Sequence, residues 1–252
     1  MARSAAHQIV SVQNLELISF GDAHGLAQAA ASGLMKAVLS ARLSGATLLT
    51  VGLSGGRISQ HFFAAVVETA RMGKISFAKV HFFWADERCV PPDDAESNYR
   101  VARELLFAPL NIPNNHIHRI RGEELPDVAA AEAEAEISRI APLTDDGKPM
   151  LDLIFLGMGE DGHVASLFPG ESESAMASPA IYRAVTAAKQ PPRRITLGYA
   201  AIAAARQVLV LASGRGKDAA LGDSLAPSGL TPLARVIKSR AITRIFTDIE
   251  GR

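Results

Sequence analysis

Short apolar segments alternate with longer amphipathic segments along the 252 residues of the chain. The apolar segments are short enough for strands and rich in β-branched or aromatic residues, as is typical of strands buried on both faces of a sheet. They lie at residues 47–53, 79–84, 151–156, 181–186, 194–197, 207–212 and 244–247. This pattern predicts seven strands.

The segments between these strands have the period of amphipathic helices. The apolar face of the helix predicted at residues 58–72 recurs at every fourth position and consists of Ile58, Phe62, Val66 and Ala70. Further helices are predicted at residues 25–43, 97–106, 127–140, 217–225 and 233–239. Strands separated by helices imply an α/β fold with a mostly parallel, Rossmann-like sheet and helices on both faces. No linker or repeat interrupts the pattern, so we predict a single domain over residues 1–252.

Three of the predicted strands run directly into polar loops. The loops are SGGR (54–57), ADER (85–88) and GMGEDGH (157–163). The carboxyl ends of parallel strands lie at one edge of a sheet, and open α/β sheets bind their ligands at that edge. We therefore expect a functional site where these three loops meet.

The third loop contains the pattern G-x-G-x-x-G at residues 157–162, which is also the spacing of a dinucleotide-binding turn. Such a turn needs a helix that begins in the loop and an acidic residue about 20 positions later. Pro169 limits any helix here to about one and a half turns, and no acidic residue stands near position 182. We favour a sharp turn that presents His163 for proton transfer, with Asp161 orienting its ring. The alternative is a structural loop histidine.

The first loop allows two kinds of chemistry. Residues 52–56 match the G-x-S-x-G of a nucleophile elbow, in which Ser54 would attack a substrate with His163 as its base. Small residues at the start of a helix also offer free N–H groups and the positive end of the helix dipole, which bind phosphate. We favour a phosphate cradle formed by Ser54, Gly55 and Gly56, and a plain turn is the third interpretation.

Charged residues near other strand ends could complete such a site. Asp86 and Arg88 follow the strand at residues 79–84 and are expected to line the pocket, although a charge run more often forms a solvated loop. Arg194 opens one strand, and Lys217 follows another. Each could meet an anionic ligand or simply be solvated.

The composition restricts the partners of the chain. The 26 basic and 26 acidic residues cancel, so no global field favours nucleic acid or an anionic membrane, and any anion site must be local. No run of about 18 apolar residues could span a bilayer. The single cysteine, Cys89, fits a reducing compartment. We expect a cytoplasmic protein without nucleic-acid or membrane partners, as a monomer or weak homo-oligomer.

The histidines outside the third loop raise the question of a metal site. His116 and His118 have a spacing that could hold a metal, but no third ligand lies near them, and the preceding Pro113-Asn-Asn predicts an exposed loop. His81 lies within an apolar strand and is expected in the core or on the face of the sheet. We therefore predict no metal.

Taken together, five stretches resemble the 6-phosphogluconolactonase family. They are LSGGR (53–57), WADERCVPPDDAESNY (84–99), LIFLGMGEDGHVASLFPG (153–170), RITLGYAAI (194–202) and VLVLASGRGKDAAL (208–221), and they follow the order of the family. The resemblance covers most of the chain from about residue 15 to about residue 250. The motifs most specific to this family are DGHxASLFP and DER…P…SNY.

The resemblance implies hydrolysis of 6-phospho-D-glucono-1,5-lactone to 6-phospho-D-gluconate, the second step of the oxidative pentose phosphate pathway, with no cofactor. His163 would be the general base that activates water, and Arg88 would stabilise the oxyanion or position His163. Asp161 and Asp86 would orient these groups. The phosphate of the sugar lactone would be held by Gly55, Gly56, Arg194 and Lys217, with Ser54 or Arg57.

Related activities remain as alternatives. Glucosamine-6-phosphate deaminases belong to the same superfamily, but their pattern carries an aromatic residue where Arg88 stands and a catalytic glutamate where Phe168 stands. A non-catalytic sugar-phosphate sensor would more often carry a DNA-binding segment, and the near-neutral charge with no spare domain argues against one. The chain departs from the lactonase pattern at residues 57–59, where Arg-Ile-Ser replaces the usual Ser-Thr-Pro. The phosphate cradle therefore lacks a threonine hydroxyl, and backbone amides, Ser54 or Arg57 would have to bind the phosphate instead.

Overall fold

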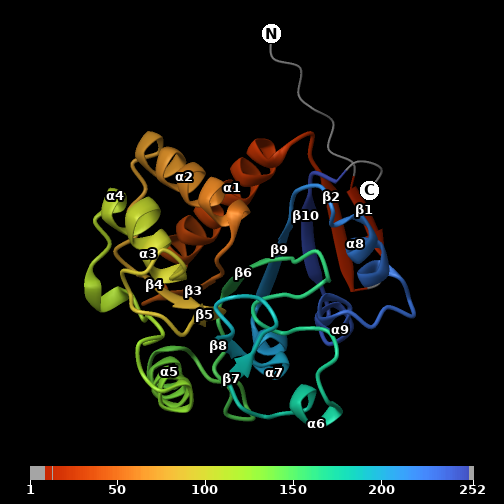
Figure 1. The fold of residues 1–252 in the computed structure, drawn as a ribbon. Coiled ribbons are helices and arrows are strands. Elements are labelled where there is room, and N and C mark those ends of the chain that lie inside the picture. Colours follow the sequence, from red (N-terminus) through yellow and green to blue (C-terminus); the bar gives the residue numbers. More distant parts are fainter. Residues whose placement is uncertain (1–8, 13, 250–252) are drawn as a thin grey trace.

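The computed structural model describes residues 9–12 and 14–249, in which strands and helices alternate nearly as predicted (Figure 1). The strands are β1 (Ile9–Val12), β2 (Leu15–Ser19), β3 (Leu49–Leu53), β4 (Val80–Trp84), β5 (Asp86–Arg88), β6 (Leu153–Gly157), β7 (Tyr182–Thr186), β8 (Arg193–Leu197), β9 (Gln207–Ala212) and β10 (Thr243–Thr247). The helices are α1 (Ala23–Leu43), α2 (Arg57–Met72), α3 (Asn98–Ala102), α4 (Ala108–Leu110), α5 (Pro126–Ile140), α6 (Glu173–Met176), α7 (Tyr199–Ala204), α8 (Asp218–Leu225) and α9 (Pro232–Lys238).

The main sheet has the strand order β1-β2-β10-β9-β6-β3-β4 in the described residues. All neighbouring pairs are parallel except β1 and β2. All five residues of β3 are buried, because the strand lies inside the sheet and is covered on both faces. The predicted mostly parallel sheet is therefore confirmed.

Helices cover both faces of this sheet. A crossover between parallel strands is right-handed in nearly all proteins. The connections through α1 and α2 advance across the sheet toward β4, whereas those from β6 to β9 and β10 advance the other way. The two sets of helices therefore lie on opposite faces, and Figure 1 shows α1 beside α2, apart from α7 and α9. This confirms the predicted arrangement.

Three strands form a second, antiparallel sheet in the order β5-β8-β7. The prediction treated residues 86–88 as a loop and assigned no separate sheet to the strands near residues 181–197, and both points were wrong. Hydrogen bonds from Ala85 N to Leu53 O and from Leu197 N to Ala85 O join this small sheet to the end of the large one, each at 2.7 Å. The strand β5 was missed because its sequence is charged, although its first two residues are buried.

Other differences concern the ends of the chain and the helix after β5. The strands β1 and β2 were missed, although Leu15 and Leu17 alternate with polar residues and are buried. The helix predicted at residues 97–106 is α3, followed by a π-helical turn at Arg103–Phe107 and then α4. The predicted apolar face of α2 is buried throughout. No helix in the described part of the chain is long and apolar enough to cross a bilayer.

Candidate active site

The loops that follow β3 and β6 meet at the centre of the sheet. From this pair the chain adds strands in opposite directions, with β4 on one side and β9 and β10 on the other. At such a switch point the connections diverge and leave a crevice at the carboxyl edge, where α/β sheets bind ligands. A cavity of about 390 Å³ opens there.

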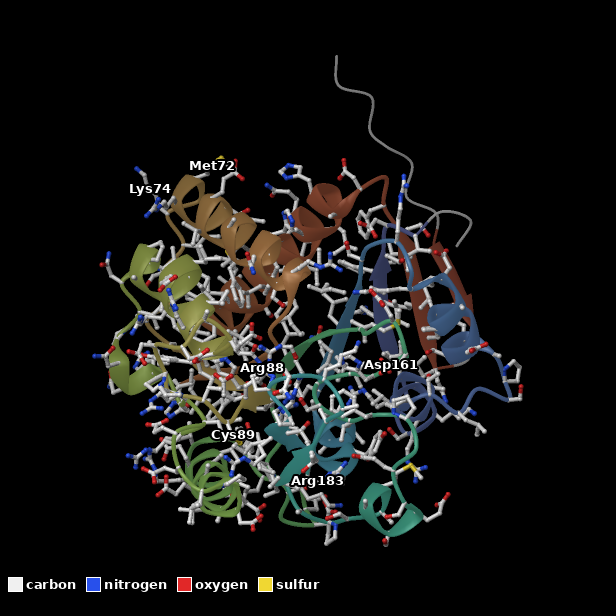
Figure 2. All side chains as sticks on the ribbon, viewed as in Figure 1. Met72, Lys74, Arg88, Cys89, Asp161 and Arg183 are labelled. Carbon is white, nitrogen blue, oxygen red and sulfur yellow. The ribbon has the colours of Figure 1, made fainter. Side chains whose placement is uncertain are left out.

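Nine of the ten predicted site residues line this cavity. They are Ser54, Gly55, Gly56, Arg57, Asp86, Arg88, His163, Arg194 and Lys217. The tenth, Asp161, contacts His163. In Figure 2, Arg88 and Asp161 lie near the middle of the molecule, whereas Met72 and Lys74 lie at the outer end of α2. The structure thus brings together side chains that are more than 160 positions apart in the sequence.

The glycine-rich loop after β6 folds back on itself. Gly159 N donates to His163 O at 2.9 Å, and Gly162 N donates to Gly159 O at 3.1 Å. Gly162 has a φ of +77°, which glycine adopts at no steric cost. The next helix, α6, begins only at Glu173. The loop therefore lacks the helix that a dinucleotide turn requires, and it places His163 at the cavity.

Asp161 fixes the ring of His163. The His163 Nδ1 lies 2.5 Å from Asp161 Oδ1, and the His163 backbone N donates to the same oxygen at 3.2 Å. Burial opposes ionisation of Asp161, but the hydrogen bond and charge of His163 outweigh it, so that the pKa of Asp161 lies below its ordinary value. An ionised Asp161 keeps the proton of a neutral His163 on Nδ1 and leaves Nε2 as the basic nitrogen.

The ring of Phe168 lies against both His163 and Arg194. The ring centroids of His163 and Phe168 are 4.8 Å apart, and the Arg194 guanidinium lies 5.6 Å from the Phe168 centroid. Arg194 and Arg88 are register partners on β8 and β5. Burial, and secondly the charge of Arg88, lower the pKa of Arg194. Two cations thus lie side by side on the wall of the cavity.

Arg88 and Arg194 are held largely by carbonyl oxygens. Arg88 donates to Glu96 O at 2.6 Å, and the Glu96 carboxylate lies 3.5 Å away. Arg194 Nε donates to Pro191 O at 3.0 Å. The Arg88 Nε is buried and has no hydrogen-bond partner among the described residues. The charges of this pair are therefore incompletely compensated and available to an anionic ligand.

Asp86 is the only carboxylate in the cavity wall described by the structure. It is 4% exposed, and its Oδ2 accepts a hydrogen bond from Ser166 Oγ at 2.8 Å. Its other carboxylate oxygen has no such bond from the described residues, so it can accept one from a ligand. This side chain can therefore accept hydrogen bonds in a cavity that is otherwise rich in donors.

The start of α2 provides backbone donors. Gly56 is the N-cap of this helix, with a φ of +103° and no side chain that caps the first turn. The hydroxyl of Ser54 is buried and has no hydrogen-bond partner among the described residues, the ring of His163 included. A helix N-terminus with an unpartnered hydroxyl fits an anion better than a nucleophile activated by histidine. The geometry thus favours a phosphate-binding start of α2 over a serine nucleophile at Ser54.

Arg57 and Lys217 add positive charge beside this helix terminus. Burial, and secondly the charge of Arg57, lower the pKa of Lys217. Neither side chain forms an ion pair within the described residues. With Arg88, Arg194 and Arg215, five cationic side chains and one carboxylate line the cavity. In a chain of zero formal net charge, this is a local concentration of positive charge, as an anion site requires.

Several lining residues were not among the predicted site residues. They are Ala23, Ile58, His61, Asn98, Gly157, Met158, Ala165, Ser213, Gly214 and Arg215. His61 follows Arg57 by one helical turn, so an i, i+4 argument could have found it. Ser213 and Arg215 stand between the strand at residues 207–212 and Lys217, where the strand-end argument applies. Asn98 had only the weaker signal of the Ser-Asn-Tyr stretch.

Three histidines, His81, His116 and His118, form a stacked group away from the cavity. His81 Nδ1 lies 2.9 Å from His118 Nε2, and His118 Nδ1 lies 2.7 Å from Glu136 Oε1. The ring of His116 stacks on that of His81. His118 is 9% exposed, so the predicted exposed loop does not extend to it. No group of three or more possible ligand residues in the described chain has the arrangement of a metal site.

Comparison with known proteins gives a family and several relatives. A family model described as glucosamine-6-phosphate isomerases/6-phosphogluconolactonase matches residues 21–245. A 6-phosphogluconolactonase of Treponema pallidum is 38% identical over 154 residues, which are 61% of this chain and 61% of that protein. The matched part of the chain thus spans about three fifths of this relative.

Two further relatives match over longer stretches. The 6-phosphogluconolactonase of Mycobacterium tuberculosis is 36% identical over 200 residues, 77% of each chain. The crystal structure of a 6-phosphogluconolactonase from Thermotoga maritima has a TM-score of 0.74 and 27% identity, and the match covers 92% of this chain and 98% of that one. The likeness therefore extends to the whole fold around the cavity.

Proposed function

We propose that this chain, which belongs to the glucosamine-6-phosphate isomerase/6-phosphogluconolactonase family, hydrolyses 6-phospho-D-glucono-1,5-lactone to 6-phospho-D-gluconate. The observation that carries the proposal is the cavity itself: a histidine oriented by a carboxylate faces a cationic wall at one edge of the sheet. This reaction is the second step of the oxidative pentose phosphate pathway, and a cytoplasmic location would suit it.

The phosphate of the lactone would occupy the start of α2. Ser54, Gly55 and Gly56 line the cavity at this place, and the Ser54 hydroxyl has no hydrogen-bond partner among the described residues. Lys217 and Arg57 supply charge-assisted contacts, and Arg57 stands where the family pattern has a serine. Binding the phosphate here would fix the far end of the sugar and orient the lactone carbonyl toward His163.

His163 would act as general base and then as general acid. Its Nε2 would accept a proton from a water molecule as the water oxygen bonds to the lactone carbonyl carbon. The tetrahedral intermediate would collapse with cleavage of the bond to the ring oxygen, which takes the proton back from the imidazolium. Asp161 would hold the ring and stabilise its positive charge in between. Proton transfer of this kind contributes about 10²–10⁴-fold to the rate.

The arginine pair would stabilise the negative charge that develops on the carbonyl oxygen. Arg88 has a buried Nε without a hydrogen-bond partner in the described residues, and a donor held in place before the reaction is an effective oxyanion stabiliser. Arg194 lies beside it across the two strands. The carboxylate of Asp86 would orient the substrate through a hydroxyl group. No covalent intermediate is needed.

Two alternatives make different predictions. A serine esterase would need Ser54 activated by His163, and no hydrogen bond joins the two in the described residues. A deaminase of amino-sugar phosphates would carry its catalytic glutamate at position 168, where this chain has Phe168 packed on His163. The lactonase needs neither feature.

The test is hydrolysis of freshly made 6-phosphogluconolactone, coupled to 6-phosphogluconate dehydrogenase and corrected for spontaneous opening. We expect opening well above background, with kcat reduced at least tenfold in His163→Ala while circular dichroism stays unchanged. Ser54→Ala is the matched comparison: it should mainly raise KM, whereas a serine esterase would lose kcat. Glucosamine 6-phosphate runs in parallel, and ammonia release without lactone opening would overturn the proposal.

A further inference from the structure

The side chain of Asn98 occupies an unusual place in the wall of the cavity. Asn98 is the first residue of α3, is 4% exposed and lines the cavity. Its Nδ2 donates to Asp86 O at 2.9 Å. Because a backbone carbonyl only accepts hydrogen bonds, this contact fixes which end of the amide is nitrogen. The carbonyl end, Oδ1, therefore points away from Asp86 O.

The amide oxygen of Asn98 lies against Gly55. A Cβ atom at position 55 would stand 1.8 Å from Asn98 Oδ1, 2.4 Å from its Cγ and 3.0 Å from its Nδ2. Oδ1 is thus the amide atom nearest to the cradle. The side chain's hydrogen bond within the described residues is made by Nδ2, so Oδ1 remains an acceptor for a ligand in the wall of the cavity.

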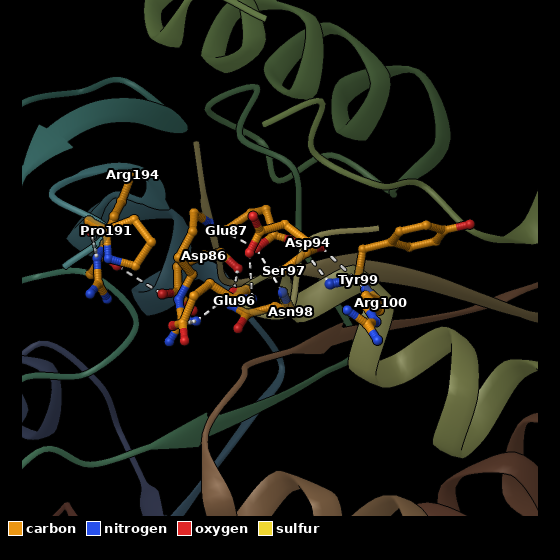
Figure 3. Close-up of polar contacts among 12 residues, drawn as sticks. Asp86, Glu87, Asp94, Glu96, Ser97, Asn98, Tyr99, Arg100, Pro191 and Arg194 are labelled. Carbon is orange, nitrogen blue, oxygen red and sulfur yellow. Dashed lines mark hydrogen bonds and ion pairs between the residues drawn. The ribbon is translucent and has the colours of Figure 1, made fainter. Parts of the chain in front are cut away.

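Glu87 holds the backbone of Asn98 in place. One oxygen of its buried carboxylate accepts the N–H groups of Arg88 and Asn98 at 2.7 and 2.8 Å. The other accepts from Tyr99 N at 2.8 Å and from Ser97 Oγ at 3.2 Å. Figure 3 shows this group of contacts around the start of α3. The hydrogen bonds tie α3 to β5, so that Asn98 keeps one position relative to Arg88.

Acceptors are scarce in the cavity. Five cationic side chains and the start of α2 offer donors, while Asp86 is the one carboxylate in the wall that the structure describes. A sugar hydroxyl that donates a hydrogen bond needs an acceptor, and an unpaired polar group in a buried site discriminates strongly between ligands that satisfy it and those that do not. Asn98 Oδ1 is placed to accept such a hydroxyl.

We propose that Asn98 is a specificity-determining residue, whose amide oxygen accepts a hydrogen bond from one ring hydroxyl of the phosphorylated lactone. The proposal rests on the proposed lactonase function. Asn98 Oδ1 lies against Gly55, and the backbone of Asn98 shares the Glu87 carboxylate with that of Arg88, so this hydroxyl would lie between the phosphate and the lactone carbonyl. Asn98 is thereby a binding residue for the sugar itself, distinct from the groups that hold its phosphate.

The experiment compares the parent lactone with its 2-deoxy, 3-deoxy and 4-deoxy analogues. The wild-type enzyme should lose about three- to tenfold in kcat/KM on one analogue, as expected for one neutral hydrogen bond. Asn98→Ala should lose a similar factor on the parent lactone and show no further loss on that analogue. Asn98→Ser, which keeps a small polar side chain, serves as the second variant if the alanine variant does not fold.

The control is Asp152→Asn. Asp152 also accepts a backbone N–H and a hydroxyl, from Thr50 at 2.8 and 2.9 Å, but it lies at the other end of β6. This variant should lower stability and leave the ratios among the four lactones unchanged. Equal kcat/KM on all four lactones in the wild type would overturn the proposal, as would equal losses on all of them in Asn98→Ala.

Failure of the lactonase function is a separate result. It would appear as no opening above background on any lactone by the wild-type protein. In that case calorimetric titration with 6-phosphogluconate and its deoxy analogues still tests Asn98. The contact would be supported if the wild-type protein binds one deoxy analogue more weakly than 6-phosphogluconate and Asn98→Ala binds the two equally well. Equal affinities of the wild-type protein for all of these ligands would overturn it.

Discussion

The close approach of Gly159 to His163 allows the proposed mechanism to be tested by adding one methyl group. An ideal Cβ at position 159 would lie 2.0 Å from His163 Nδ1, 2.1 Å from its Cε1 and 2.7 Å from Asp161 Oδ1. Ordinary contacts of a Cβ begin near 3.4 Å. In Gly159→Ala the imidazole must therefore retreat by about 1.4 Å or the loop must open.

Either movement breaks the hydrogen bond between Asp161 and His163. A misplacement of about 1 Å can cost about 10²-fold in rate, and the whole proton transfer contributes about 10²–10⁴-fold. We therefore expect kcat for 6-phosphogluconolactone to fall about 100-fold or more. KM should change little, because the groups proposed to hold the phosphate belong to other loops.

The assay is the coupled lactone hydrolysis, with thermal unfolding measured on the same samples. Gly33→Ala is the control, because a Cβ at Gly33 meets nothing within 4 Å in the middle of α1. That variant should keep full activity and gain about 1 kcal/mol of stability from helix propensity. A Gly159→Ala protein with kcat within threefold of wild type would refute the role given to the Asp161–His163 pair.

Two further variants test other parts of the structure. Burial, and secondly the charge of Arg57, lower the pKa of Lys217 below its ordinary value of 10.5, so that this side chain loses its charge at a lower pH than a free lysine. KM of the wild-type protein should therefore rise at alkaline pH. Lys217→Arg keeps the charge, and a KM that depends on pH equally in this variant would contradict the reasoning. Tyr182→Phe removes the buried hydrogen bond from Tyr182 Oη to Trp84 O at 2.6 Å. The free energy of unfolding, measured in urea, should fall by about 1–3 kcal/mol, while kcat and KM stay unchanged. Unaltered stability would show that this bond does not secure the small sheet.

The site was predictable to the extent that it depends on strand ends. Ser54 directly follows the buried strand β3 and His163 lies in the loop that follows β6, and the carboxyl ends of parallel strands share one edge whatever their order. The ends of the short apolar segments show where such strands end, which is why these residues could be assigned to one edge of the sheet before any contact was known. The order of the strands, and with it the switch point between β3 and β6, was not available from the pattern.

Contacts between distant segments were not predictable in this way. Arg88 and Arg194 are neighbours because β5 and β8 pair antiparallel, and the charged sequence of β5 resembles a solvated loop. Asn98 lies eleven positions beyond Glu87 and reaches the cavity only because that buried carboxylate binds the start of α3. In both cases the decisive interaction is a hydrogen bond between segments whose sequences carry no shared pattern.

The charges of the cavity connect binding with stability. Burial disfavours the charged forms of both Arg194 and Lys217, and desolvated like charges are costly unless a counter-charge is present. A chain with 26 basic and 26 acidic residues provides no broad field to attract substrate from a distance, so affinity must come from this local imbalance. Under the proposed function, a dianionic phosphate would relieve the imbalance on binding. The same desolvation that destabilises the empty cavity would therefore favour phosphorylated over neutral sugars.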